Sequence, residues 1–137
     1  MSHREIVKAQ LRIDEDSRRF PYRDSVGKLT IGVGRNLDDV GLRPDEIDYM
    51  LENDISEAEG DARELFPSFD ALSDARKAVL VNMCFNLGRS RLSAFHKFRA
   101  AVSDGEWERA AAEMIDSKWA AQVGIRAQRL SKQMREG

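Results

Sequence analysis

The spacing of apolar residues predicts a short amphipathic helix at the start of the chain. Apolar side chains recur at helical spacing from Ile6 to Ile13. Ser2 followed by Glu5 fits a capping box, in which each residue caps a free group of the first helical turn. We therefore expect a helix over residues 3 to about 15.

The pattern then changes to the two-residue alternation of a β-strand. A short strand is expected at Pro21–Asp24, followed by a turn at Ser25–Gly27 and a half-buried strand at Lys28–Gly34. Its expected faces are Leu29, Ile31 and Val33 on one side and Lys28, Thr30, Gly32 and Gly34 on the other. The second face is expected to be open, and its glycines either let a ligand approach the backbone or serve only twist.

Helical spacing returns at Pro44, which suits a first helical position, and continues to about residue 65. After the break at Phe66-Pro67, shorter helices are expected at about 74–87, 90–102, 106–115, 118–121 and 124–135. Ala78–Leu87 is apolar nearly all round and should be the central buried helix. Its two amides, Asn82 and Asn86, must be satisfied in the core or face a cleft.

Composition narrows the class of protein. The chain has 137 residues, 42% apolar and 34% charged, as expected for one globular domain or two small lobes. No apolar run could span a bilayer, no signal peptide is visible, and we expect no membrane insertion. One cysteine and two histidines exclude an internal disulfide and disfavour a zinc site, so neither a metal nor a cofactor is expected.

The charge is unevenly distributed. Residues 1–66 carry 10 basic and 16 acidic side chains, whereas residues 67–137 carry 12 basic and 8 acidic. The basic part could lie against a polyanion or be a solvated helical surface, and the second interpretation is favoured.

The candidate chemistry lies in the first 30 residues. Glu15 ends the first expected helix, Asp24 ends the first strand, and Thr30 lies on the next strand. Two carboxylates on separate rigid elements beside a groove are what glycoside hydrolysis requires, one as proton donor and one ionised. Taken alone, such a pair is more often ordinary surface charge.

These residues belong to a longer stretch that resembles phage-type lysozymes, the endolysins of glycoside hydrolase family twenty-four. The resemblance rests on the spacing Glu-x8-Asp-x5-Thr and on Thr-Ile-Gly-x-Gly. It covers almost the whole chain, in the segments Leu11–Glu15, Tyr22–Asp24, Thr30–Gly34, Ser73–Arg76, Leu80–Gly88, Ala94–Phe95, Trp107–Ala111, Ser117–Trp119 and Arg126–Leu130.

The resemblance implies roles. Glu15 would be the general acid, Asp24 would activate the attacking water, and Thr30 would help to hold it. Such enzymes invert, so their carboxyl groups should stand roughly 6.5–9.5 Å apart. The substrate would be the β-1,4 bond between N-acetylmuramic acid and N-acetylglucosamine in peptidoglycan. Arg126 matches the family arginine that pairs with the catalytic glutamate. The positive charge of this arginine would favour the ionised form of Glu15, whereas burial would favour the protonated form.

The resemblance also implies a mainly α, α+β fold with two lobes. A small hairpin lobe would span about 14–65, and a helical lobe would hold 66–137 with the N-terminal helix 3–14; the glycan would lie between the lobes. Positions expected to contact sugars are Asn36, Asn82, Phe85, Asn86, Phe98 and Glu113. Arg35 stands where the longer enzymes often have histidine, and the short segment before Pro44 leaves room for little or no third strand.

The resemblance further implies a monomeric endolysin that stays in the host cytoplasm until a holin-type pore opens.

Three alternatives to a lysozyme remain. A wall-binding module without activity would not need Glu15, Asp24 and Thr30 together. A nucleic-acid binder could use the basic residues of the last helix, yet no base-stacking aromatics accompany them, so no nucleic-acid partner is expected. A lytic transglycosylase would need the acid but no water-activating aspartate.

Overall fold

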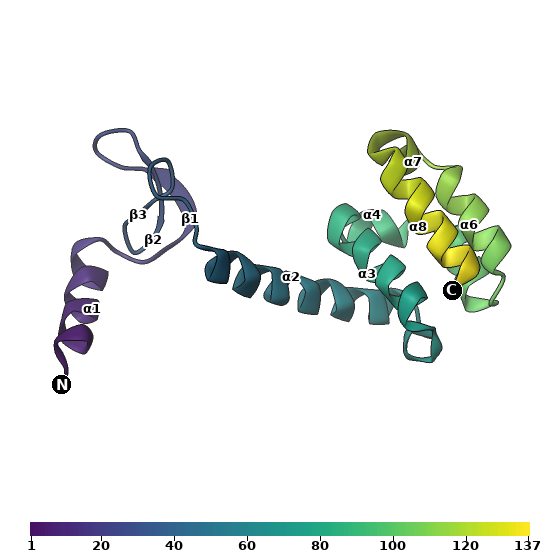
Figure 1. Ribbon diagram of the computed structural model, residues 1–137, viewed down its shortest axis with the longest axis horizontal. Helices are drawn as coiled ribbons and strands as arrows, with labels where there is room; N and C mark the ends of the chain where they lie inside the picture. The colour runs from purple at the N-terminus through teal and green to yellow at the C-terminus, as the bar shows by residue number, and fades with distance from the viewer. The chain divides into compact units, whose positions relative to one another are not determined.

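The computed structural model describes all residues from Met1 to Gly137 and divides into two compact units. Unit 1 spans Met1–Tyr49 and unit 2 spans Met50–Gly137. The long helix α2, Pro44–Leu65, contains the boundary, so its first turn belongs to unit 1 and the remainder to unit 2. Figure 1 shows both units coloured along the chain, with most of their elements labelled.

Unit 1 begins with α1, His3–Asp14, as the apolar spacing predicted. The capping box is present: Glu5 N donates to Ser2 Oγ at 3.2 Å, and Ser2 N donates to Glu5 Oε2 at 2.8 Å. The helix ends at Asp14, and Glu15 is its C-cap, whose backbone N–H donates to Leu11 O at 2.8 Å. This ending matters because it places Glu15 where the helix gives way to the sheet.

Three antiparallel strands follow in the order β1-β2-β3: Arg18–Arg23, Leu29–Gly32 and Arg35–Asn36. The prediction that β1 starts at Pro21 is wrong. The strand starts earlier because β1 lies at an edge, where a proline without N–H is tolerated, and its pairing with β2 shifts register between Arg18 and Tyr22. β3 has two residues, in keeping with the minimal third strand expected.

The second strand is also shorter than predicted, because it ends at Gly32 instead of Gly34. Gly32 and Gly34 have φ angles of +68° and +71°, a left-handed conformation that favours glycine. These two glycines therefore form the tight connection from β2 to β3 instead of extending the strand.

Unit 2 is helical, and its helices after α2 are Asp74–Leu87 (α3), Arg89–Ser93 (α4), His96–Ser103 (α5), Trp107–Ile115 (α6), Lys118–Val123 (α7) and Ile125–Glu136 (α8). A single turn of 3-10 helix at Phe69–Ala71 precedes α3. The single helix predicted at 90–102 is wrong. It is two helices, because the chain breaks at Ala94–Phe95 and lets the Phe95 ring pack edge-on against Phe98, with centroids 6.4 Å apart.

The hydrophobic core lies within unit 2. As predicted, α3 is central to it: Val79, Leu80 and Met83 are all fully buried. α8 packs against both α6 and α3, and Figure 1 shows α6 and α8 side by side. The core therefore fixes α3, α6 and α8 as a rigid frame, from which the polar residues of α3 and α8 project.

Two further contacts secure this frame. Arg76 at the start of α3 donates to the carbonyls of Met134 and Arg135 at 2.8 and 3.0 Å, which caps the end of α8, and it lies over the Trp107 ring. Trp119 is also buried and belongs to this core.

The eight helices and one small sheet confirm the predicted mainly α, α+β class. None of the helices combines the length and the apolar character needed to cross a lipid bilayer.

Candidate active site

Glu15 lies at the junction of α1 and the sheet, and its side chain rests on the backbone of Gly34. A Cβ atom on Gly34 would stand only 3.1 Å from both Cγ and Oε2 of Glu15. Gly34 also has a positive φ of +71°, so a side chain there would be disfavoured twice. The close approach explains why this hairpin connection needs glycine, and it ties Glu15 to the tip of the β2–β3 hairpin.

Asp24 closes the turn between β1 and β2. Its Oδ1 accepts hydrogen bonds from Val26 N at 3.0 Å and Lys28 N at 2.8 Å. This is an Asx-type turn, in which the side chain replaces a backbone acceptor. The hydrogen bonds within the turn use one carboxylate oxygen, which leaves Oδ2 able to accept a proton from water.

Thr30 is buried, with 3% of its surface exposed, so the prediction that it lies on an open strand face is wrong. Its hydroxyl donates to Lys28 O at 2.9 Å. Because the hydroxyl proton is already engaged, only the lone pairs of Oγ1 remain for a water molecule. The alternation of the strand did not reveal this burial, because β2 is the central strand and Thr30 lies between Tyr22 and Asn36 of the neighbouring strands.

The sheet places Asn36 beside Thr30. Tyr22, Thr30 and Asn36 are register partners across the three strands. The Asn36 amide is engaged with Asp39, accepting from its backbone N–H at 3.0 Å and donating to its carboxylate at 2.9 Å. Asn36 is thus half-buried and holds the turn that follows β3, which limits what it could offer a sugar.

A further group of polar residues, which the sequence did not point out, anchors β3 to the start of α2. Arg35 donates two parallel hydrogen bonds to the Glu46 carboxylate, at 2.7 and 2.8 Å, and a third to Gly41 O at 3.1 Å. Glu46 Oε1 also accepts from Arg43 N at 2.8 Å. We call Arg35, Gly41, Arg43 and Glu46 the clamp.

The clamp has a clear electrostatic signature. The Arg35 fork, with the Arg43 N–H, lowers the pKa of Glu46 from 4.5 to about 2, and in return Glu46 raises the pKa of Arg35. Sequence reasoning identified Arg35 only as a departure from the family pattern. Its partner lies 11 residues away, a distance at which no periodic pattern indicates a contact.

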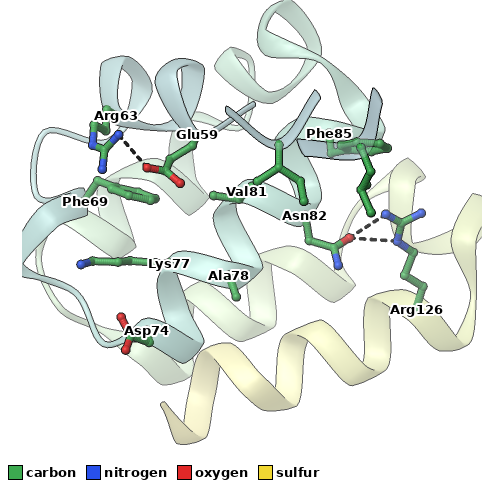
Figure 2. A pocket seen from close by; sticks show the side chains of 12 residues that line it. Glu59, Arg63, Phe69, Asp74, Lys77, Ala78, Val81, Asn82, Phe85 and Arg126 are labelled. Atoms are coloured by element: carbon green, nitrogen blue, oxygen red, sulfur yellow. Dashed lines mark hydrogen bonds and ion pairs between the residues drawn. The ribbon is translucent and has the colours of Figure 1, made fainter. Parts of the chain in front are cut away.

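In unit 2, three predicted residues meet at one hollow of about 640 Å³ between α2 and α3, with Arg126 of α8 at one end. Arg126 donates to Asn82 Oδ1 through Nε at 3.1 Å and Nη2 at 2.6 Å. Phe85, 47% exposed, lies next to them, and Figure 2 shows all three at one end of the hollow. The Glu59–Arg63 ion pair lies at the opposite end.

Two other predicted residues of unit 2 lie at a second hollow of about 610 Å³, which is lined by residues from the end of α3 to α7. Glu113 and Phe98 line it, but Phe98 is only 1% exposed and its ring packs edge-on against Phe66 and Phe95. The buried Trp119 also lines the hollow and donates from Nε1 to Asn86 Oδ1 at 2.8 Å. Asn82 and Asn86 are therefore both satisfied as acceptors; Asn82 lines the first hollow, whereas Asn86 lines neither of the two and is bonded to Trp119.

No set of three or more histidine, cysteine, aspartate or glutamate side chains converges in a way that would hold a metal ion. The buried Cys84 thiol, whose pKa is raised by burial, belongs to no such set.

Comparison with known proteins places this arrangement in a family. The family model described as phage lysozyme matches residues 14–136. A probable T4-type lysozyme 2 of Dictyostelium discoideum is 27% identical, over 90% of both chains, and a probable T4-type lysozyme 1 of the same organism is 25% identical, again over 90% of both. The pre-baseplate central spike protein Gp5 of Enterobacteria phage T4 is 26% identical, over 88% of this chain but 26% of that protein.

Proposed function

We propose catalytic roles for Glu15 and Asp24 from the finding that the chain belongs to the phage lysozyme family, whose members are glycoside hydrolases acting on peptidoglycan. In this proposal Glu15 and Asp24 perform the two proton transfers of the reaction. Unit 1 supports this assignment. Glu15 ends α1 against the β2–β3 hairpin, and Asp24 ends β1 with one carboxylate oxygen free of the turn. The observation that carries the proposal is the seating of Glu15 on Gly34, because it fixes an acid at the tip of the motif.

The proposed reaction cleaves the bond from N-acetylmuramic acid to N-acetylglucosamine. Protonated Glu15 gives its proton to the glycosidic oxygen as the bond from C1 breaks. Asp24 takes a proton from a water molecule that attacks C1 from the opposite face, so the configuration inverts. Thr30 would accept a hydrogen bond from that water through its free lone pairs.

Product analysis on purified peptidoglycan tests the proposal. The parent should release muropeptides with a reducing end, and these should carry ¹⁸O after reaction in H₂¹⁸O. Glu15→Gln and Asp24→Asn should each lose nearly all activity, with the fold of both confirmed by circular dichroism. Anhydro ends would identify a lytic transglycosylase and remove the role of Asp24, and clearing of permeabilised cells by the Glu15→Gln variant would remove that of Glu15.

We extend the proposal to the glycan contacts. Phe85 offers an exposed aromatic face beside Asn82 in the larger hollow of unit 2, and aromatic faces suit the apolar side of a sugar ring. Glu113 lines the smaller hollow together with Trp119, whose indole N–H donates to Asn86. The buried Phe98 would support the lining of the smaller hollow without contacting the glycan itself. Asn36 would influence glycan binding only through the turn after β3 that it holds.

Arg126 is proposed to act on the ionisation of Glu15, as the family resemblance implies. A guanidinium near Glu15 favours its ionised form and so works against the acid that the reaction needs. Arg126→Ala should therefore shift the alkaline limb of the activity profile to higher pH, measured as kcat/KM against pH. A profile that coincides with the parent's would contradict this coupling and leave Arg126 as the partner of Asn82.

The biological setting is also proposed. The enzyme would be a monomeric endolysin that accumulates in the host cytoplasm and reaches the wall through a holin-type pore. Expression in a Gram-negative host should then cause lysis only when a pore-forming protein is co-expressed. Lysis without the pore would contradict holin dependence, and size-exclusion chromatography with light scattering would check the monomer.

A further inference from the structure

The clamp lies directly beside the residue on which Glu15 rests. Gly34 carries the Glu15 side chain, and Arg35 is its chain neighbour and the first residue of β3. Arg35 in turn is held by the Glu46 carboxylate and by Gly41 O. A continuous set of contacts therefore runs from the first turn of α2 through β3 to Glu15, all of it within unit 1.

Two features show that the clamp fixes a position and is more than a surface ion pair. The Arg35 fork is bidentate, which specifies orientation as well as distance. Its acceptor Glu46 is itself held, because Glu46 Oε1 accepts from Arg43 N and its residue belongs to the first turn of a 22-residue helix. By contrast β3 has only two residues, so the sheet alone offers little to hold the hairpin tip.

We propose that Arg35 and Glu46 are positioning residues, which keep Gly34 where the Glu15 carboxyl can rest on it in the orientation that proton donation requires. The inference rests on the proposed function for its catalytic part. Its structural part, the dependence of the Glu15 side chain on the clamp, stands independently. In this role Arg35 and Glu46 act only through Gly34.

The decisive variants are Glu46→Gln, which keeps the shape of the side chain and removes its charge, and Arg35→Lys, which keeps the charge and removes the fork. The matched control is Glu106→Gln, which removes a carboxylate from an exposed pair with Arg109 at 2.8 Å in unit 2. The assay measures kcat and KM on solubilised peptidoglycan chains. A ¹³C spectrum records the Glu15 carboxyl signal, assigned by its loss in Glu15→Gln.

Glu46→Gln should lower kcat about tenfold with KM within about twofold of the parent, because a small misplacement of a catalytic group is costly while binding is spared. The Glu15 carboxyl signal and the Gly34 amide signal should both move in the free enzyme. The kcat of Arg35→Lys should lie between those of Glu46→Gln and the parent. Glu106→Gln should match the parent in kcat, KM and both NMR signals.

Two results would overturn the inference. One is a Glu46→Gln variant that is folded, with the Glu15 and Gly34 signals at the parent positions. The other is a loss of kcat that Glu106→Gln reproduces. Should Glu46→Gln fail to fold, Arg35→Lys provides the same two readouts. An inactive parent would instead count against the proposed function, while the two NMR signals would still decide whether the clamp positions Glu15.

Discussion

Gly34 illustrates how a single residue without a side chain can determine the geometry of a site. Its left-handed backbone turns the chain from β2 into β3, and its missing Cβ provides the space that Glu15 occupies. Either requirement alone would favour glycine, and the two together disfavour any residue that carries a Cβ.

Gly34→Ala should therefore abolish most of the activity. The new Cβ would lie 3.1 Å from Glu15 Cγ and Oε2 and would displace the carboxyl by a few tenths of an ångström, which should lower the rate about tenfold. The measurement is kcat on purified peptidoglycan.

The control is Gly105→Ala in unit 2, which has a similar φ of +67° but only an ordinary contact with Trp107 at 3.8 Å. It should carry the backbone strain of about 1 kcal/mol without losing activity. Equal activity losses in both variants would show that strain, and not the displaced carboxyl, is responsible.

At this scale the sequence points to candidate residues but not to how their side chains are held. The motif spacing favours Glu15 and Asp24 as the catalytic pair, and these roles stay predictions. It placed Thr30 on an open face, whereas the residue is buried, because alternation cannot show that a strand is flanked on both sides. Nor could it reveal that the Arg35 side chain has a partner.

At the scale of elements, the first turn of α2 depends on the ionisation of Glu46. Its carboxylate binds the Arg35 fork and the Arg43 N–H, and both contacts lower its pKa to about 2. A carboxyl group whose pKa is lower in the folded than in the unfolded chain stabilises the fold at any pH above its pKa in the unfolded chain. This stabilisation is lost as the pH falls to the pKa of the group in the folded chain. For Glu46 this window runs from about pH 4.5 to about pH 2.

The parent should accordingly lose stability between these two pH values, and Glu46→Gln should lose less over the same range. The two melting curves, recorded by circular dichroism in matched buffers, should differ most above pH 4.5 and converge near pH 2. Curves separated by the same interval throughout would show that the ionisation of Glu46 does not contribute.

Element boundaries could be predicted where local chemistry sets them. Ser2, Pro44 and Gly88 mark the ends of α1, α2 and α3 as expected from caps and proline. The break between α4 and α5 could not be predicted, because Ala94 and Phe95 are compatible with a helix. It arises from the packing of Phe95 against Phe98, a tertiary contact that overrides local preference.

At the scale of the whole chain, the two units differ in how they are stabilised. Every residue of the hydrophobic core cluster lies between Ala58 and Met134, hence in unit 2, while unit 1 is held by hydrogen bonds and the clamp. A fragment of residues 50–137 should fold alone, because it keeps its complete core. A fragment of residues 1–49 should not, because it buries too little apolar surface to offset the entropy of folding.

Urea titration followed by circular dichroism would check both fragments. The 50–137 fragment should unfold cooperatively, and Leu80→Ala in it should cost about 2–5 kcal/mol, since Leu80 is fully buried. Non-cooperative unfolding of this fragment would mean that unit 2 requires residues of unit 1.

One outer strand of unit 1 has a consequence for crowded solutions. The edge of β1 presents backbone groups that a neighbouring molecule could pair with, yet Pro21 offers no N–H there, and Arg18, Arg19 and Arg23 repel their counterparts on a second copy. At high protein concentration the chain should therefore resist aggregation through pairing of β1 edges, whether into fibrils or amorphous precipitate. Replacing these four residues with threonine should remove that protection.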